Sequence, residues 1–156
     1  MIESQPRKPE DLEGLEKILL SVETWGGDQN ELLWCKKLDD SKYQLKNLPF
    51  YAYDLSYDDV VVASVIKEFL AAELVAERSG HSTYRVFATN ADMFFANWER
   101  FSKLGCTFEK ATERLFAIDV PPQTDVHSVY QALEEGENGG VWEFEEGHCG
   151  HFVEEP

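Results

Sequence analysis

The sequence predicts an α+β protein in which a small N-terminal β-barrel or curled antiparallel sheet precedes a ferredoxin-like half with the element order βαββαβ. In the first half, short strand-like segments alternate with turn residues, which is typical of small barrels. In the second half, segments with helical spacing alternate with strand-like segments. Of the 156 residues, 43% are hydrophobic and 13% are aromatic, which is enough to fill a packed interior. We expect a flexible N-terminal segment over 1–16, a β-rich subdomain over 17–80 and an α+β subdomain over 81–156.

The strands of the first half are predicted from alternating and β-branched runs. Segment 12–25 fits either a helix or a strand, and the hairpin-like sequence after it favours a strand. The turn DDS joins the alternating segments 31–38 and 42–50 into a β-hairpin. The run VVVASVI at 60–66 predicts a buried strand, and a further hairpin is expected across SGHS at 79–82.

The second half is predicted to hold two helices among its strands. The first helix spans 90–105, with Asn90 or Thr89 as its N-cap and a terminal glycine, and its apolar stripe should bury Trp98 against the sheet. The second helix lies within 124–140 and ends at glycines. Three strands complete this half, and they are expected at 106–112, 114–122 and 141–147.

Charge is the strongest global signal in the sequence. Thirty acidic residues oppose fourteen basic ones, giving a formal net charge of −16. From Leu115 to Pro156 there are ten carboxylates and no Lys or Arg. Such a field repels nucleic acid and anionic membranes and attracts cationic surfaces, so we expect neither a nucleic-acid nor a membrane partner. Three cysteines and an N-terminus without the signal-peptide pattern favour a cytoplasmic location.

The run GHCGH at 147–151 is the most suggestive of chemistry. His148, Cys149 and His151 could supply zinc ligands, or a thiol nucleophile with a histidine base. However, His148 and Cys149 are adjacent, and adjacent residues of an extended chain face opposite sides. No CxxC or HxxxH motif supplies the missing ligands of a four-coordinate site. We therefore expect no metal, no cofactor and no catalytic residue, and a metal- or thiol-dependent enzyme is the less favoured alternative.

Other enzyme patterns are incomplete. Ser79, His81 and Ser82 lie together in the sequence, but the G-x-S-x-G elbow of serine hydrolases is missing and a turn explains the run better. The glycine-rich GENGG lacks the Lys and Ser/Thr of a phosphate-binding P-loop. Glu143 and Glu145 share one face of a strand, where they lack the apolar pocket that a general acid needs.

Three motifs carry a family resemblance: NLPFYAYDLSYDDVV, ERSGHSTYRV and the terminal WEFEEGHCGH. In these the chain resembles an uncharacterised bacterial family, the domain of unknown function numbered four-two-six-five. The resemblance runs from about Lys17 to His151, with Asp58 where the family often has Gly. It implies no catalytic role for any residue. In size and charge, rather than in a motif, the chain is also similar to small acidic immunity proteins encoded beside bacterial toxins.

These observations favour a non-catalytic binding protein. We expect a cytoplasmic immunity protein, of the kind found in toxin–antitoxin and contact-dependent growth inhibition systems, that neutralises a basic protein toxin. A nuclease is the leading candidate, because a nuclease cleft must be basic to hold phosphates and an acidic face can mimic them. The alternative is a small-molecule-binding regulatory domain with a pocket between its halves. The candidate partner-binding residues are Asp58, Asp59, Glu134, Glu135, Glu137, Glu143, Glu145 and Glu146.

Overall fold

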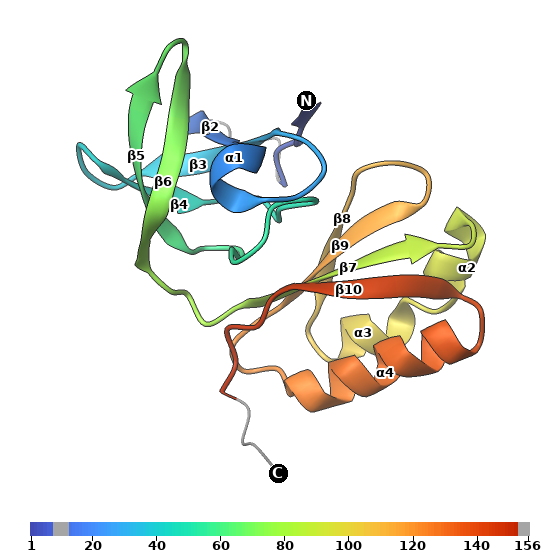
Figure 1. The fold of residues 1–156 in the computed structure, drawn as a ribbon. Helices are drawn as coiled ribbons and strands as arrows, with labels where there is room; N and C mark the ends of the chain where they lie inside the picture. The colour runs from blue at the N-terminus through green and yellow to red at the C-terminus, as the bar shows by residue number, and fades with distance from the viewer. Residues whose placement is uncertain (8–12, 153–156) are drawn as a thin grey trace.

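The computed structural model describes residues 1–7 and 13–152 of the chain. The fold is mixed α+β, with a barrel-forming sheet in the N-terminal part and a second sheet, covered by helices, in the C-terminal part (Figure 1). No helix in the described ranges is long and apolar enough to cross a membrane.

The N-terminal part is a closed barrel of five strands, as the alternating segments predict. The strands follow the order β3-β2-β6-β5-β4, and β4 also pairs with β3, which closes the ring. The short helix α1 carries Trp25 into the barrel, where its indole Nε1 donates a hydrogen bond to Ala72 O over 3.0 Å. A short strand, β1, pairs in parallel with the start of β3. The elements are β1 (Ile2–Glu3), β2 (Leu15–Leu20), α1 (Val22–Trp25), β3 (Glu31–Lys37), β4 (Lys42–Leu45), β5 (Val60–Ile66) and β6 (Phe69–Glu77).

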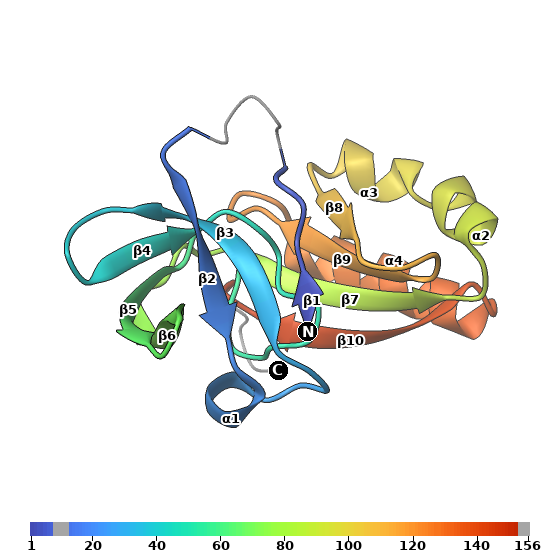
Figure 2. The same cartoon turned by 90° about the horizontal axis from the view of Figure 1, so that it is seen from above.

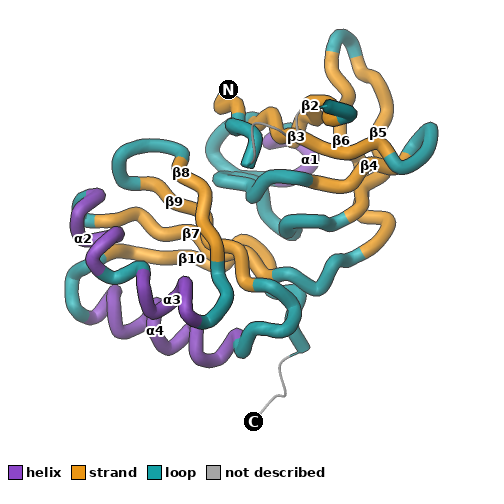
Figure 3. The backbone as a smooth tube through the Cα atoms, turned by 180° about the vertical axis from the view of Figure 1, so that it is seen from behind, coloured by secondary structure: helices purple, strands orange, loops and turns teal. Residues whose placement is uncertain are grey.

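The C-terminal part is a four-stranded antiparallel sheet with the order β10-β7-β9-β8. Figure 2 shows β10 at the margin of this sheet, with β7, β9 and β8 following in turn. The helices α3 and α4 lie on the side of the sheet that faces away from the barrel (Figure 3). The elements are β7 (Ser82–Ala88), α2 (Ala91–Ala96), α3 (Glu99–Lys103), β8 (Thr107–Lys110), β9 (Leu115–Val120), α4 (Val126–Asn138) and β10 (Trp142–His148).

The two parts share a small apolar interface. Alternation along β9 sends Phe116 and Ile118 into the core beneath the helices and Ala117 towards the barrel. There Ala117 packs with Leu48 and Phe50, which belong to the loop between β4 and β5. The larger cores lie on either side of this interface, one inside the barrel and one between the second sheet and its helices.

Most predicted strands are confirmed, but the hairpin across SGHS was wrong. β6 pairs with β5 and β2, whereas β7 pairs with β10 and β9, so residues 78–81 connect the two sheets instead of turning within one. The predicted flexible segment 1–16 includes β1 and the start of β2, so the barrel contains residues that the sequence assigned to that segment. Residues 8–12 of it lie outside the described part of the chain.

The helix predicted over 90–105 was also wrong in its continuity, because it is interrupted between α2 and α3. Asn90 caps α2 as expected, accepting a hydrogen bond from Met93 N over 2.9 Å. At the break, the Asn97 side chain donates to Met93 O over 2.8 Å and takes a carbonyl that a continuous helix would use. Trp98 is consequently only partly buried at the margin of the core, whereas Phe94 is completely buried.

Candidate functional site

Six of the predicted carboxylates belong to α4 and β10, a helix and an outer strand that are adjacent in the C-terminal part. Glu134, Glu135 and Glu137 are on the last turns of α4, and β10, which follows after a glycine turn, carries the other three. β10 is the outer strand of the sheet and α4 packs beside it (Figure 1). All six residues are exposed. We call this surface the acidic edge; it consists of Glu134, Glu135, Glu137, Glu143, Glu145 and Glu146.

Among the described residues, cations pair with only two members of the acidic edge. Glu135 forms an ion pair with Arg100, which lowers the pKa of Glu135. Glu145 lies 2.9 Å from Nη2 of the buried Arg85. The other members accept hydrogen bonds from uncharged donors or, among the described residues, have no hydrogen-bond or ion-pair partner. The edge therefore keeps a concentrated negative charge.

Two uncharged groups donate hydrogen bonds to carboxylates of the acidic edge. Glu137 accepts from Phe144 N over 3.1 Å, and Glu146 accepts from the Tyr84 hydroxyl over 3.2 Å. Within residues 1–7 and 13–152, no such partner occurs for the side chains of Glu134 and Glu143. Four of the six carboxylates thus have no cationic partner in the part of the chain described.

Exposed aromatic side chains accompany the acidic edge. Phe87 lies directly across from Glu143 in the β7–β10 pair and is 47% exposed. Tyr130 of α4 is 44% exposed and packs edge-on against Phe144. On the barrel side, the Tyr53 hydroxyl donates to Glu145 over 2.8 Å, which raises the pKa of Tyr53. Aromatic anchors next to charged groups are typical of protein–protein interfaces.

The remaining two predicted residues are not part of this surface. Asp59 is 1% exposed, and its carboxylate accepts hydrogen bonds from the backbone N–H groups of Ser56 and Ser79. Asp58 forms an ion pair with Lys46 over 2.7 Å. Both belong to the loop that precedes β5, where Asp59 fixes local backbone and Asp58 is neutralised.

The side chains of GHCGH diverge. His148 Nδ1 lies 3.3 Å from Asp54 Oδ1, and burial lowers the pKa of His148. Cys149 Sγ contacts the carbonyl of His151. Within residues 1–7 and 13–152, no group of three or more His, Cys, Asp or Glu side chains is arranged to hold a metal ion.

His151 forms a pair that the sequence analysis missed. Its Nδ1 lies 2.6 Å from Ser82 Oγ, and its Nε2 lies 2.9 Å from Pro121 O, so Nε2 carries the proton and Nδ1 accepts from the hydroxyl. Ser82 is completely buried and also accepts from Gly150 N. This arrangement holds Gly150 and His151 against β7, with the Ser82 hydroxyl buried between them.

A second unpredicted cluster surrounds the loop between β4 and β5. The buried carboxylate of Glu31 accepts hydrogen bonds from the N–H groups of Phe50, Tyr51 and Ala52, at 2.6, 2.9 and 2.7 Å. Arg85, from β7, donates to the Ala52 carbonyl over 2.6 Å. Residues 50–52 of the loop are therefore bound through their N–H groups by the barrel and through the Ala52 carbonyl by the second sheet. Glu31 directly precedes the apolar run LLWC of β3, and a carboxylate beside such a buried run was the available signal.

Glu109 of β8 completes this junction. It accepts from Leu48 N and from Asn47 Nδ2, each over 2.7 Å. Arg7 approaches the same carboxylate at 3.7 Å. Burial nevertheless raises the pKa of Glu109 to about 7. Together Glu31, Arg85 and Glu109 form what we call the junction cluster.

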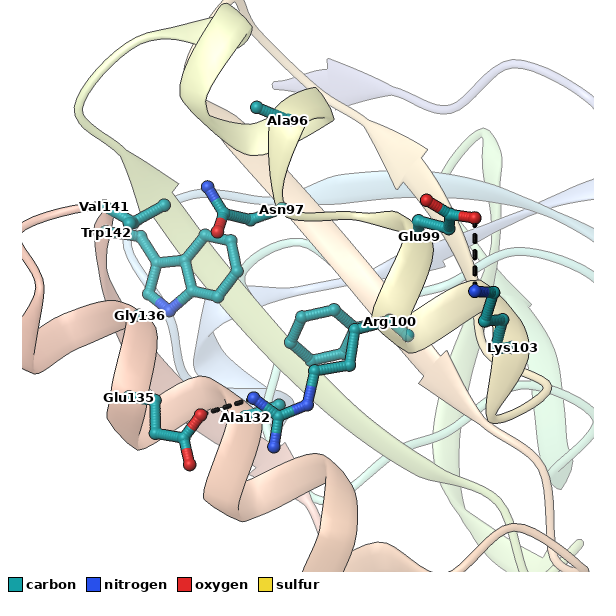
Figure 4. A pocket seen from close by; sticks show the side chains of 11 residues that line it. Ala96, Asn97, Glu99, Arg100, Lys103, Ala132, Glu135, Gly136, Val141 and Trp142 are labelled. Carbon is teal, nitrogen blue, oxygen red and sulfur yellow. Dashed lines mark hydrogen bonds and ion pairs between the residues drawn. The ribbon is translucent and has the colours of Figure 1, made fainter.

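Two cavities are of a size to hold a small ligand. The first, about 480 Å³, lies between α3 and α4 over Trp142 (Figure 4). Its charged groups pair with one another, Arg100 with Glu135 and Lys103 with Glu99, so none of these four is directed at a ligand. The second, about 760 Å³, lies between the two parts of the molecule; among its described lining residues are Arg7, Lys36, Lys46, Tyr57, Thr107 and Asp119.

Comparisons with known proteins agree with this architecture. A solved structure described as a hypothetical protein from Neisseria gonorrhoeae is similar in fold, with a TM-score of 0.71 at 17% identity, covering 90% of this chain and 96% of that one. No curated protein matches the sequence. The family model described as Domain of unknown function (DUF4265) matches residues 31–144, from the start of β3 to within β10. This match spans well over half of the chain and includes the loop held by the junction cluster, so the protein belongs to the DUF4265 family.

Proposed function

We propose that the protein is a non-catalytic, cytoplasmic binding protein that uses its acidic edge to bind a basic protein. The observation that carries the proposal is that the adjacent elements α4 and β10 expose six carboxylates, with only Arg85 and Arg100 as cationic partners among the described residues. A concentrated negative field accelerates encounter with cationic proteins, and the exposed aromatic groups beside it can anchor the complex.

The partner that fits best is a basic bacterial toxin, which would make the protein an immunity protein. A nuclease must hold phosphates in a cationic cleft, and a row of carboxylates can occupy the same positions. We place Glu134, Glu137, Glu143 and Glu146 at the centre of this contact, because they have no cationic partner among the described residues.

Co-expression tests the proposal. The protein is produced with the product of the gene immediately upstream, and both cell growth and formation of a complex are measured. We expect restored growth and a stable complex. Changing Glu134, Glu137, Glu143 and Glu146 together to Gln should weaken the complex by about 1–4 kcal/mol.

A matched control removes the same charge elsewhere. Glu16→Gln, Glu23→Gln, Asp28→Asn and Glu68→Gln change four exposed carboxylates of the barrel part. This variant should retain nearly all of the affinity. An upstream product that is harmless alone, or that does not associate at micromolar concentration, would exclude the immunity function.

A second candidate function is supported by the cavity between the two parts. Arg7 and Lys46 both lie over the ring of Tyr57, at 4.6 and 5.4 Å from its centroid, and Lys36 lines the same cavity. Arg7 and Lys46 already pair with Glu109 and Asp58, and Glu13 and Asp119 line the same cavity. Lys36 is therefore the lining cation without an ion-pair partner among the described residues, and a small anionic ligand could bind to it. A thermal-shift screen with carboxylates and phosphates tests this, with Lys36→Ala expected to reduce any shift and Lys37→Ala as the control.

We also propose that the C-terminal part is a ferredoxin-like domain. Its strand order β10-β7-β9-β8, with all pairs antiparallel and helical segments between β7 and β8 and between β9 and β10, supports this classification. Its first helical segment departs from the simple pattern, because it is divided into α2 and α3.

A further inference from the structure

The strand that carries half of the acidic edge also has an unpaired backbone side. β10 pairs with β7 along one side, and no other strand in the described residues pairs along its opposite side. An edge strand of this kind presents N–H and C=O groups that can pair with a strand from another molecule.

The hydrogen bonds show which amides of β10 face outward. Val141 O accepts from Thr89 N, so the carbonyl of Val141 is directed towards the β7 side at the start of the pairing, while its N–H donates to Gly136 O. Phe144 N donates to the Glu137 carboxylate and not to β7. Because backbone direction alternates along an antiparallel strand, the amide of Glu146 faces outward like that of Phe144. The far end is already occupied, since Gly147 O accepts from Asp54 N of the barrel part.

The side chains along this open stretch define its partner. Glu143 and Glu145 flank one face of the strand and Glu146 the other, while Glu137 reaches over Phe144 N. A strand laid beside β10 would place its own side chains next to these carboxylates on both faces. Lys and Arg would be stabilised there, whereas acidic side chains would be repelled.

We propose that an extended, Lys- or Arg-rich segment of the partner pairs with Trp142–Glu146 of β10 as an additional antiparallel or parallel strand. This inference rests on the proposed function and specifies how the acidic edge is used. Glu137 is displaced from Phe144 N when the partner's carbonyl takes its place. The outward N–H and C=O groups of β10 orient the added strand, and the carboxylates favour Lys and Arg in its sequence.

The experiment uses a short peptide of alternating lysine and valine as the probe and the full-length protein. Two further peptides carry N-methyl groups, one on every lysine amide and the other on every valine amide. In an added strand only one of these sets of amides faces β10. We therefore expect one methylated peptide to bind about as tightly as the parent and the other to bind at least about tenfold more weakly.

Two variants of the protein test whether the backbone amide of Glu146 takes part in binding the peptide. Glu146→Ala removes the charge and keeps the amide, whereas Glu146→Pro removes both, at a position where the amide is not used by β7. The proline variant should bind the peptide at least about tenfold more weakly than the alanine variant. Circular dichroism shows whether the proline variant is folded; the methylated peptides decide the question if it is not.

Three outcomes would overturn strand addition. They are equal binding of both methylated peptides, equal binding by the alanine and proline variants, and no binding of the parent peptide at low salt. The first two leave the acidic edge intact as a charge-based binding surface. Failure of the proposed function itself is seen separately, in the experiment with the upstream-encoded protein.

Discussion

Glutamates in the junction cluster and in the acidic edge have opposite surroundings. Glu31 is completely buried, and its two carboxylate oxygens accept three backbone N–H groups. Glu143 is exposed and, among the described residues, has no hydrogen-bonding partner. The first carboxylate is fully used in holding a loop in place, and the second is free to interact with another molecule. For binding another molecule, the relevant carboxylates are therefore those that are exposed and not already hydrogen-bonded within the fold.

The arginines that pair with these carboxylates also differ in burial. Arg85 lies at the boundary, since it donates to Ala52 O in the junction and lies 2.9 Å from Glu145 of the acidic edge. Its side chain is 2% exposed, so its charge is committed to the fold. Arg100, which pairs with Glu135, is half exposed, and exposed ion pairs of this kind contribute little to stability.

The largest expected effect is on the junction. Glu31→Ala leaves three buried N–H groups without an acceptor, and we expect it to lower the free energy of unfolding by about 3–5 kcal/mol. Urea denaturation measures the change, with the exposed Glu16→Ala as a control that should lose less than about 0.5 kcal/mol. A loss for Glu31→Ala as small as that of the control would remove the distinction between the two regions.

The aromatic core provides the next effect. Phe94 is completely buried and stacks on Phe116, so Phe94→Ala should cost about 3–5 kcal/mol. Trp98 is only partly buried at the margin, and Trp98→Ala should cost less, about 1–3 kcal/mol. The same denaturation experiment checks both. A larger loss for Trp98→Ala would show that the break between α2 and α3 is placed incorrectly.

A smaller effect depends on pH and on Glu109. The pKa of Glu109 is about 7 in the folded protein, against 4.5 in the absence of burial. Between these values the folded state binds more protons than the unfolded state, so the free energy of unfolding falls as pH rises from 4.5 to 7.

We expect Glu109 to contribute a decrease of about 1–3 kcal/mol across this interval. The non-titrating variant Glu109→Gln should lack that part of the pH dependence, which denaturation of both proteins at several pH values measures. Identical pH profiles, or a wild-type profile that rises more steeply than that of the variant, would contradict the assignment. No such dependence is expected from Glu143→Gln on the acidic edge.

The sequence was sufficient for features that depend on local pattern. Alternation located the hairpin of β3 and β4, and the second helix predicted within 124–140 is α4. The NLPF motif, which carries part of the family resemblance, is in the loop that Glu31 and Arg85 bind.

Features that depend on distant contacts could not be read from the sequence. SGHS has the composition of a hairpin turn, and the pairing of β7 with β9 and β10 decides that it is a connection. The partner of His151 is Ser82, which is 69 positions away. Asp59 and Glu143 look equally available in sequence, and only the fold shows that Asp59 is buried.

Binding of a basic protein by the acidic edge is tested by the rate of association with the upstream-encoded protein at increasing salt. Long-range attraction is screened within about 8 Å at 0.15 M salt, so the wild-type rate should fall steeply from low to physiological ionic strength. Changing Glu134, Glu137, Glu143 and Glu146 to Gln should slow association and flatten this dependence. The matched variant of the barrel part should keep most of the association rate and most of its salt dependence. A rate that is independent of salt, or the same loss in both variants, would contradict the account.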